Sequence, residues 1–157
     1  MYRLPKSEFS VGLDISSKAL EDAKKKGMKN VSFIQCDVTK GLPLKEGIFD
    51  VIICADNLEH VTEPAKVVEN IYHLSKQDTR IIFSVPNETL FLKIKFLLRW
   101  LRLSSLILKN IEGKKSEWHL HHDFNEKKLR SIISNRFHII KVKSAYFMYV
   151  ITKVKKG

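Results

Sequence analysis

The alternation of strand-like and helix-like segments is the feature that most constrains this fold. Residues 49–55 (FDVIICA) form a continuous apolar run, which is typical of a strand buried on both faces of a sheet. β-rich runs at residues 9–15, 31–36 and 80–85 predict three more strands, and helical segments follow the first and third strands of the series. This order predicts an α/β fold with an open, mostly parallel sheet that carries helices on both faces.

Capping residues and apolar spacing locate the first two helices. Ser16 or Ser17 is expected to cap the first helix, and Gly27 suits the left-handed conformation at its end. Pro64 is expected to open the second helix, because proline is favoured at the first helical position. The residues expected to face inward are Ala19, Leu20 and Ala23 on the first helix and Ala65, Val68, Ile71, Tyr72 and Ser75 on the second.

The end of the chain predicts a further helix and an edge hairpin. A helix is expected from about residue 125, with Leu129, Ile132 and Ile133 facing inward. Two β-rich runs at residues 137–145 and 146–154 follow in close succession, which predicts an antiparallel hairpin at the sheet edge. Since no internal repeat or low-complexity linker is present, residues 1–157 are predicted to form one domain.

A basic amphipathic segment interrupts the alternation at residues 88–124, which are predicted to be an insertion. On a helix, Lys95, Arg99 and Arg102 fall within about 60° of one another, leaving an aliphatic and aromatic face. The segment is too charged for an undisturbed membrane span. Residues 90–109 are instead expected to contact a membrane surface peripherally, with ordinary packing over the sheet as the alternative.

Positive charge is concentrated in the second part of the chain. The formal net charge is +11, yet residues 1–87 carry 12 basic and 12 acidic side chains, against 16 and 5 in residues 88–157. A neutral part suits a small cofactor, and a basic part suits an anionic partner or is simply a solvated lysine surface. The two cysteines, Cys36 and Cys54, lie in apolar runs without zinc-site spacing, which predicts core thiols and a cytoplasmic protein.

An acid follows each of the first two predicted strands, Asp14 after the first and Asp37 after the second. Ligands of parallel sheets bind at the carboxyl ends of the strands, where a carboxylate can accept both hydroxyls of a ribose. Asp14 is the candidate for that role, and Asp37 is placed to accept from the exocyclic amine of an adenine. An acid that ends a strand is also a common cap or loop residue, although two in series weaken that alternative.

The chain resembles the class I S-adenosylmethionine-dependent methyltransferases, especially the small-molecule and lipid branch of the type 11 kind. The resemblance lies in four stretches in order, VGLDIS, FIQCDVTKGLPLKEGIFDVIICADNLEHV, RIIFSVPN and HLHHDFNEKKLRSII. It implies a Rossmann-like fold, S-adenosyl-L-methionine as cofactor, a ribose contact at Asp14 and Ile15, and an adenine contact at Asp37 and Val38. The residues implied to line the methionine end are Ala55, Asp56, Asn57 and Leu58.

One family element has no counterpart in this sequence. The family begins with a strand and a glycine-rich loop, typically GxGxG, whereas residues 1–10 contain no glycine. In the family that strand lies between the strands that would here end at Asp14 and near Ala55. We therefore expect a truncated reading frame with reduced cofactor affinity. The alternatives are direct pairing of the two flanking strands, or another chain that fills the position in an oligomer.

Methyl transfer to a hydroxyl needs alignment of the acceptor and a base. His60, just beyond the third strand, is the candidate catalytic base, and Glu59 can orient it or join a metal site. A surface histidine or one at a helix entry is the alternative explanation for His60.

Four potential metal ligands cluster in the sequence, namely His119, His121, His122 and Asp123. No metal site is predicted there, because on an extended segment His122 faces away from the other two histidines and no distant partner is identifiable. The resemblance instead implies a substrate-facing loop, with Trp118 or His121 near the acceptor.

These features predict a methyltransferase that acts on a small-molecule or anionic lipid acceptor, with Lys95, Arg99 and Arg102 at the substrate. Two alternatives stay open. The first is a non-catalytic methyltransferase-like binding or regulatory module, and the second is an RNA methyltransferase, suggested by charge alone. Nucleic acid is disfavoured, because basic and aromatic side chains are not interleaved as a stacking platform.

Overall fold

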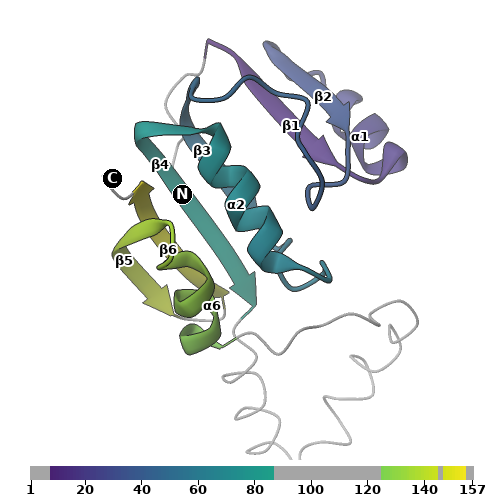
Figure 1. Ribbon diagram of the computed structural model, residues 1–157. Helices are drawn as coiled ribbons and strands as arrows, with labels where there is room; N and C mark the ends of the chain where they lie inside the picture. Colours follow the sequence, from purple (N-terminus) through teal and green to yellow (C-terminus); the bar gives the residue numbers. More distant parts are fainter. Residues whose placement is uncertain (1–7, 87–124, 145–146, 155–157) are drawn as a thin grey trace, which may run out of the picture. The chain divides into compact units, whose positions relative to one another are not determined.

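The computed structural model describes residues 8–86, 125–144 and 147–154 (Figure 1). It has two compact units, unit 1 (Met1–Leu44) and unit 2 (Lys45–Gly157), and the described strands form two sheets, one of two strands and one of four. Strands and helices alternate as expected, which confirms the α/β, Rossmann-like fold class. The single domain with an insertion stays a prediction, and residues 88–124 lie outside the described residues.

Unit 1 consists of strand β1 (Ser10–Asp14), helix α1 (Ser17–Lys24) and strand β2 (Val31–Gln35). The two strands are parallel, with Asp14 opposite Gln35 at their carboxyl ends, and α1 packs against both of them. This βαβ order is the parallel-strand arrangement that the sequence predicted.

Local chemistry explains where α1 begins and ends. The hydroxyl of Ser16 accepts a hydrogen bond from the Ala19 amide at 3.2 Å, so Ser16 is the cap. Gly27 has φ +63°, the left-handed conformation that was expected after the helix. Leu20 is buried, but the prediction that Ala19 faces inward was wrong, because Ala19 lies on the exposed side of a short helix.

Unit 2 contains one mixed sheet in the strand order β3-β4-β6-β5. The β3 and β4 strands are parallel, whereas β6 runs antiparallel to both β4 and β5. The antiparallel hairpin at the sheet edge is thereby confirmed. The elements of the unit are β3 (Phe49–Ala55), α2 (Pro64–Leu74), β4 (Ser75–Pro86), α6 (Glu126–Ile133), β5 (Phe137–Ser144) and β6 (Phe147–Val154).

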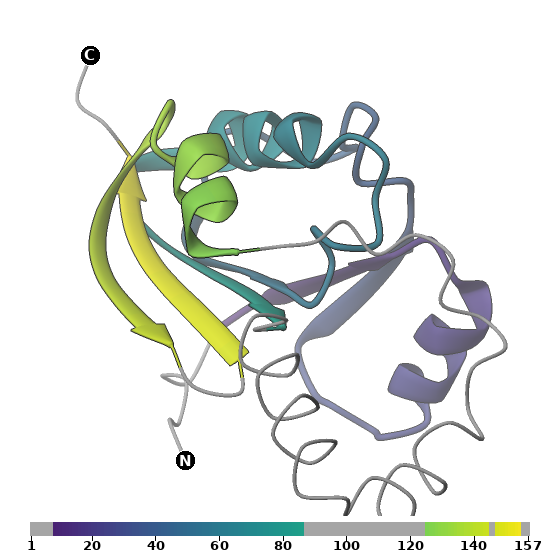
Figure 2. The same cartoon turned by 90° about the horizontal axis from the view of Figure 1, so that it is seen from below.

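Helices α2 and α6 lie on the same side of this sheet (Figure 2). The core between them and the strands is made of fully buried side chains, including Ile81, Phe83, Val85, Leu129, Ile133 and Val150. The inward stripe of α2 is Val67, Val68, Ile71 and Leu74. Ala65 is exposed and Ser75 belongs to β4, so the predictions that these two residues face inward on α2 were wrong. The buried stripe includes Val67 and Leu74 in their place.

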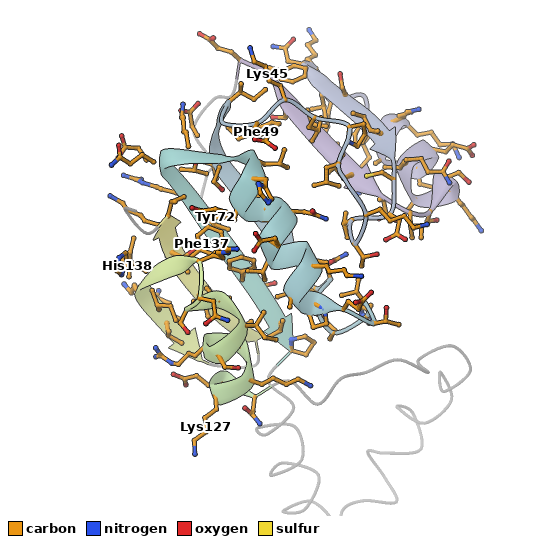
Figure 3. All side chains as sticks on the ribbon, in the orientation of Figure 1. Lys45, Phe49, Tyr72, Lys127, Phe137 and His138 are labelled. Carbon is orange, nitrogen blue, oxygen red and sulfur yellow. The ribbon has the colours of Figure 1, made fainter. Side chains whose placement is uncertain are left out.

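An aromatic and ionic contact fixes α2 against the start of β5. The rings of Tyr72 and Phe137 are 5.9 Å apart between the helix and the strand (Figure 3). Arg136 lies 5.0 Å from the Tyr72 ring centre and donates two hydrogen bonds to Glu69, at 2.7 and 2.8 Å. The Glu69 carboxylate also raises the pKa of Arg136, so this guanidinium stays charged.

The prediction that residues 49–55 are buried on both faces was wrong. Cys54 is 8% exposed on the side of the helices, whereas Ile53 on the other side is 47% exposed. The reason is that both described helices of unit 2 cover one face of the sheet. Direct pairing between the strands that end at Asp14 and Ala55 is not found among the described strands, because they belong to different sheets.

Candidate functional site

The two carboxylates predicted to act together do lie at one edge of unit 1. Asp14 ends β1, and its carbonyl accepts a hydrogen bond from the amide of Cys36 at 3.0 Å; Asp37 is the next residue. The Cys36 thiol lies near both acids: burial raises its pKa most, and the charges of Asp37 and then Asp14 raise it further. The parallel pairing of β1 and β2 therefore brings the two carboxylates into one small region.

Asp14 keeps one carboxylate oxygen available. Its Oδ1 accepts a hydrogen bond from the Ser16 amide at 2.8 Å, and among the described residues no hydrogen bond reaches Oδ2. Ile15, which follows it, is 67% exposed, although its carbonyl is fixed by the Gln35 side-chain amide at 3.0 Å. This end of β1 thus offers an acceptor beside an exposed apolar side chain, a combination that suits a sugar and the base attached to it.

Asp37 is held more tightly. Its Oδ1 accepts hydrogen bonds from the amide and the hydroxyl of Thr39, at 3.0 and 2.6 Å. Its Oδ2 lies 3.6 Å from the ammonium of Lys40. These contacts, led by the Thr39 hydroxyl, lower the pKa of Asp37 and keep it anionic. Asp37 therefore shapes the turn after β2, as the loop-residue alternative expected, and presents mainly Oδ2 to a ligand next to the half-buried Val38.

The tip of β3 in unit 2 has an unusual backbone. Asp56, directly after Ala55, has φ +48°, in the left-handed region that few residues other than glycine adopt. Its amide donates to the Ser84 carbonyl at 3.0 Å, and the buried Ser84 hydroxyl donates to Asp56 Oδ1 at 3.0 Å. Sequence reasoning missed Ser84, because nothing local links residues 28 positions apart; only the pairing of β3 with β4 joins them.

The next residue supplies a buried acceptor. Asn57 Oδ1 is buried and has no hydrogen-bond partner among the described residues. A buried acceptor without a donor is costly in a folded protein, and it is satisfied when a ligand brings an N–H or O–H group to it. Leu58, by contrast, is fully buried, so its side chain belongs to the core and only its backbone can line a ligand site.

Glu59 and His60 form an acid–histidine pair beyond the tip. Glu59 is 1% exposed, and its Oε1 lies 3.9 Å from Nε2 of His60, whose side chain is 41% exposed. The backbone amide of His60 donates to the Asn57 carbonyl at 3.0 Å, which closes the turn. The pair places a buried carboxyl group near an accessible imidazole, at a distance longer than a hydrogen bond.

Neither cysteine has the properties of a nucleophile. Burial, followed by the charges of Glu59 and Asp56, raises the pKa of Cys54 to about 12, so this thiol is protonated at neutral pH. The raised pKa of Cys36 has the same consequence. The predicted substrate-binding residues Lys95, Arg99, Arg102, Trp118 and His121, and the histidine cluster, lie outside the described residues.

Comparisons with known proteins identify the family of the chain. Residues 2–149 match the family described as "Methyltransferase domain". Ubiquinone biosynthesis O-methyltransferases of Serratia proteamaculans (strain 568) and Neisseria meningitidis serogroup C (strain 053442) are 34% and 32% identical to this chain over 79 and 84 residues. Those alignments cover 48% and 51% of this chain, and the matched part spans about a third of each relative, 33% and 35%.

Solved structures with low sequence identity share the fold. A SAM dependent methyltransferase from Aquifex aeolicus has a TM-score of 0.65 at 14% identity, covering 92% of this chain and 68% of its own. The N-methyltransferase NodS from Bradyrhizobium japonicum WM9, in complex with S-adenosyl-L-homocysteine, has a TM-score of 0.62 at 13% identity, covering 93% and 66%. With its strand order, its paired acids and the match over residues 2–149, the chain belongs to the methyltransferase domain family of class I, S-adenosylmethionine-dependent proteins.

Proposed function

We propose that this chain takes part in S-adenosylmethionine-dependent methyl transfer to a hydroxyl group of a small-molecule or lipid-like acceptor. The observation that carries the proposal is the placement of Asp14 and Asp37 at adjacent ends of β1 and β2. The reaction class follows the relatives, which are named O-methyltransferases of ubiquinone biosynthesis.

The residues present fit the donor groups of the cofactor. S-adenosylmethionine presents ribose hydroxyls, an adenine amine and an ammonium group, all of which donate hydrogen bonds. In unit 1, oxygens of Asp14 and Asp37 are the matching acceptors for the ribose and the adenine. In unit 2 by itself, the Asn57 oxygen is a buried acceptor without a donor among the described residues. When bound, the cofactor supplies a methyl group already activated on a sulfonium. The chain's own work is therefore binding, orientation and movement of one proton.

His60 is the proposed base. Its Nε2 lies 3.9 Å from the buried Glu59 carboxyl group, and the imidazole would take the proton of the acceptor hydroxyl. The Glu59 charge then stabilises the imidazolium that results, so Glu59 is a positioning residue. His60 would hold that proton until solvent removes it.

Calorimetry with S-adenosylmethionine tests the cofactor contact. We expect Asp14→Ala to weaken binding at least tenfold, because the acceptor for the ribose hydroxyls is lost. Asp22→Ala is the matched control, since Asp22 is an exposed carboxylate on α1 that forms an ion pair with Lys25 at 2.8 Å. Millimolar or weaker binding that Asp14→Ala leaves unchanged would overturn the enzyme proposal and favour a non-catalytic module.

Transfer of a labelled methyl group to a phenolic acceptor tests the base. His60→Gln should lower kcat at least a hundredfold without changing cofactor affinity, which is within the usual contribution of a general base. His73→Gln is the control, because His73 is an exposed histidine on α2 that pairs with Glu69. Glu59→Gln should shift the acidic side of the pH profile of kcat. Equal activity of His60→Gln and His73→Gln would exclude His60 as the base.

An anionic or lipid-like acceptor is proposed from the charge excess after residue 88. Among the described residues no helix combines the length and apolarity needed to cross a bilayer. Flotation with vesicles of phosphatidylglycerol or phosphatidylcholine tests surface contact. A variant with Lys95, Arg99 and Arg102 changed to Gln should lose the preference for the anionic vesicles, and equal flotation of that variant would refute the lipid proposal.

A further inference from the structure

Ser84, near the end of β4, holds the tip of β3 through two hydrogen bonds. The two strands are parallel neighbours, and their register places Ser84 opposite Ala55, the last residue of β3. The Ser84 carbonyl accepts from the Asp56 amide at 3.0 Å, and the Ser84 hydroxyl donates to Asp56 Oδ1 at 3.0 Å. One residue of the neighbouring strand therefore fixes both the backbone and the side chain of Asp56, and all of these contacts lie within unit 2.

The two hydrogen bonds place different demands on position 84. Any residue there supplies the backbone carbonyl, but the second bond requires a side chain with a hydroxyl. Asp56 has φ +48°, and a residue other than glycine keeps such a conformation only where the surrounding structure holds it. A hydrogen bond to a carboxylate is also stronger than one between neutral groups. The Ser84 hydroxyl is therefore a specific contact that favours the left-handed conformation of Asp56.

The conformation of Asp56 sets the path of the chain that follows it. Asn57 is the next residue, and its Oδ1 is a buried acceptor without a partner among the described residues. The Asn57 carbonyl accepts a hydrogen bond from the His60 amide at 3.0 Å, so the turn up to His60 begins here. Because a change of φ at Asp56 redirects every atom after it, Ser84 controls the position of the Asn57 oxygen through Asp56.

We propose that Ser84 is a positioning residue for the cofactor, because its hydroxyl holds Asp56, and through it Asn57, in the conformation that binds. The inference rests on the proposed function, and it assigns to Asn57 the cofactor donor that the acids of unit 1 do not take, the ammonium of the amino acid end. A binding conformation that is populated only in part lowers the apparent affinity by that fraction. Loss of the hydroxyl therefore weakens only those ligands that use the Asn57 oxygen.

Two ligands separate this role from a general effect on folding. S-adenosyl-L-homocysteine carries an adenine, a ribose and the amino acid end, whereas 5′-methylthioadenosine lacks the amino acid end. Calorimetry uses the full chain at a temperature at which circular dichroism shows each variant to be folded. Ser84→Ala should weaken binding of S-adenosyl-L-homocysteine by about fivefold or more and change binding of 5′-methylthioadenosine by less than about twofold. A merely structural hydroxyl would weaken both ligands alike, because only the folded fraction would fall.

Ser75→Ala is the matched control. Ser75 begins the same strand, β4, at the end away from the tip, and its hydroxyl donates to the Ile71 carbonyl at 2.6 Å. Its loss should leave the affinity for both ligands unchanged. Ser84→Thr and Ser84→Val form a second comparison, because their side chains have nearly the same shape and differ in the hydroxyl. Threonine should keep the affinity for S-adenosyl-L-homocysteine and valine should lose it, which decides the question even if Ser84→Ala fails to fold.

The outcomes distinguish this inference from the proposed function. Equal affinity of Ser84→Ala and Ser75→Ala for S-adenosyl-L-homocysteine would overturn the inference alone, as would equal affinities of Ser84→Thr and Ser84→Val. A parallel loss of both ligands in Ser84→Ala would reduce Ser84 to a structural residue. Binding of 5′-methylthioadenosine but not of S-adenosyl-L-homocysteine by the parent chain would show that Asn57 does not receive the amino acid end. If the parent chain binds neither ligand, the proposed function fails, and the inference fails with it.

Discussion

Substitution of Asp56 tests the backbone at the tip of β3 most directly. Asp56→Ala forces a residue with little tolerance for φ +48° into the left-handed region, which costs about 1 kcal/mol more than for aspartate. It also removes the acceptor of the Ser84 hydroxyl, and a buried hydroxyl left without a partner costs about 1–2 kcal/mol. We therefore expect Asp56→Ala to lower the free energy of unfolding by about 2–3 kcal/mol.

Two further substitutions separate the contributions. Asp56→Gly tolerates the left-handed conformation but leaves the Ser84 hydroxyl without its acceptor, so it should lower the free energy of unfolding by about 1–2 kcal/mol. Asp56→Asn tolerates the conformation and keeps an oxygen acceptor, so it should stay within about 0.5 kcal/mol of the parent chain. The expected destabilisation therefore increases from Asp56→Asn to Asp56→Gly to Asp56→Ala.

Urea unfolding of the full chain, followed by circular dichroism, measures these differences at constant m-value. Asp50→Ala is the control, because Asp50 is an exposed carboxylate at the other end of β3 whose ion pair with Lys76 is worth at most about 1 kcal/mol. If Asp56→Gly proves as destabilising as Asp56→Ala, the backbone argument is wrong. If Asp56→Asn is as destabilising as Asp56→Ala, the hydrogen bond from Ser84 does not stabilise the tip.

Three other predictions concern single side chains. Thr39 lowers the folded-state pKa of Asp37, so this pair stabilises the fold at pH values above the ordinary aspartate pKa of about 3.9. The stabilisation is lost as the pH falls through the folded-state pKa of Asp37. Thr39→Val should raise the pKa of Asp37 in a carboxyl-detected NMR titration, and an unchanged pKa would contradict this prediction. Cys54 should resist iodoacetamide at pH 8 in the folded chain while Cys36 reacts slowly, as judged by mass spectrometry; modification of Cys54 first would contradict its burial. Leu129→Ala, at a fully buried position on α6, should cost about 2–5 kcal/mol in urea unfolding, and a cost below 1 would mean that the core is not closed there.

The sequence was sufficient to predict the elements that depend on local pattern. The apolar run at Phe49–Ala55 has the same bounds as β3. Ser16 caps α1, and Gly27 has a left-handed conformation beyond the end of that helix, as expected. The joint placement of Asp14 and Asp37 was also predictable, since the carboxyl ends of neighbouring parallel strands must meet at one edge. Each of these features depends on residues near one another in the chain, or on a general rule of parallel sheets.

Features that depend on tertiary pairing were not predictable. Helical spacing identified a stripe on α2 but not its centre, so exposed Ala65 was placed inward and buried Val67 was not. The contact of Ser84 with Asp56 depends on the register of β3 against β4, which a single sequence does not state. Periodicity likewise cannot tell a strand covered on two faces from one covered on one face, so the exposure of Ile53 was missed.

The two faces of β3 differ in burial, and the tip of the strand depends on only one of them. Cys54 points into a core closed by α2 and α6, and that packing holds the strand end rigidly enough to keep Asp56 in a left-handed conformation. Ile53, one residue earlier, points to the opposite face and contributes nothing to that core, so it can change without disturbing the tip. Since successive residues of a strand alternate between faces, the carboxyl end and the face of Ile53 can be altered independently, and the variants at Asp56 and Ile53 should have additive effects on stability.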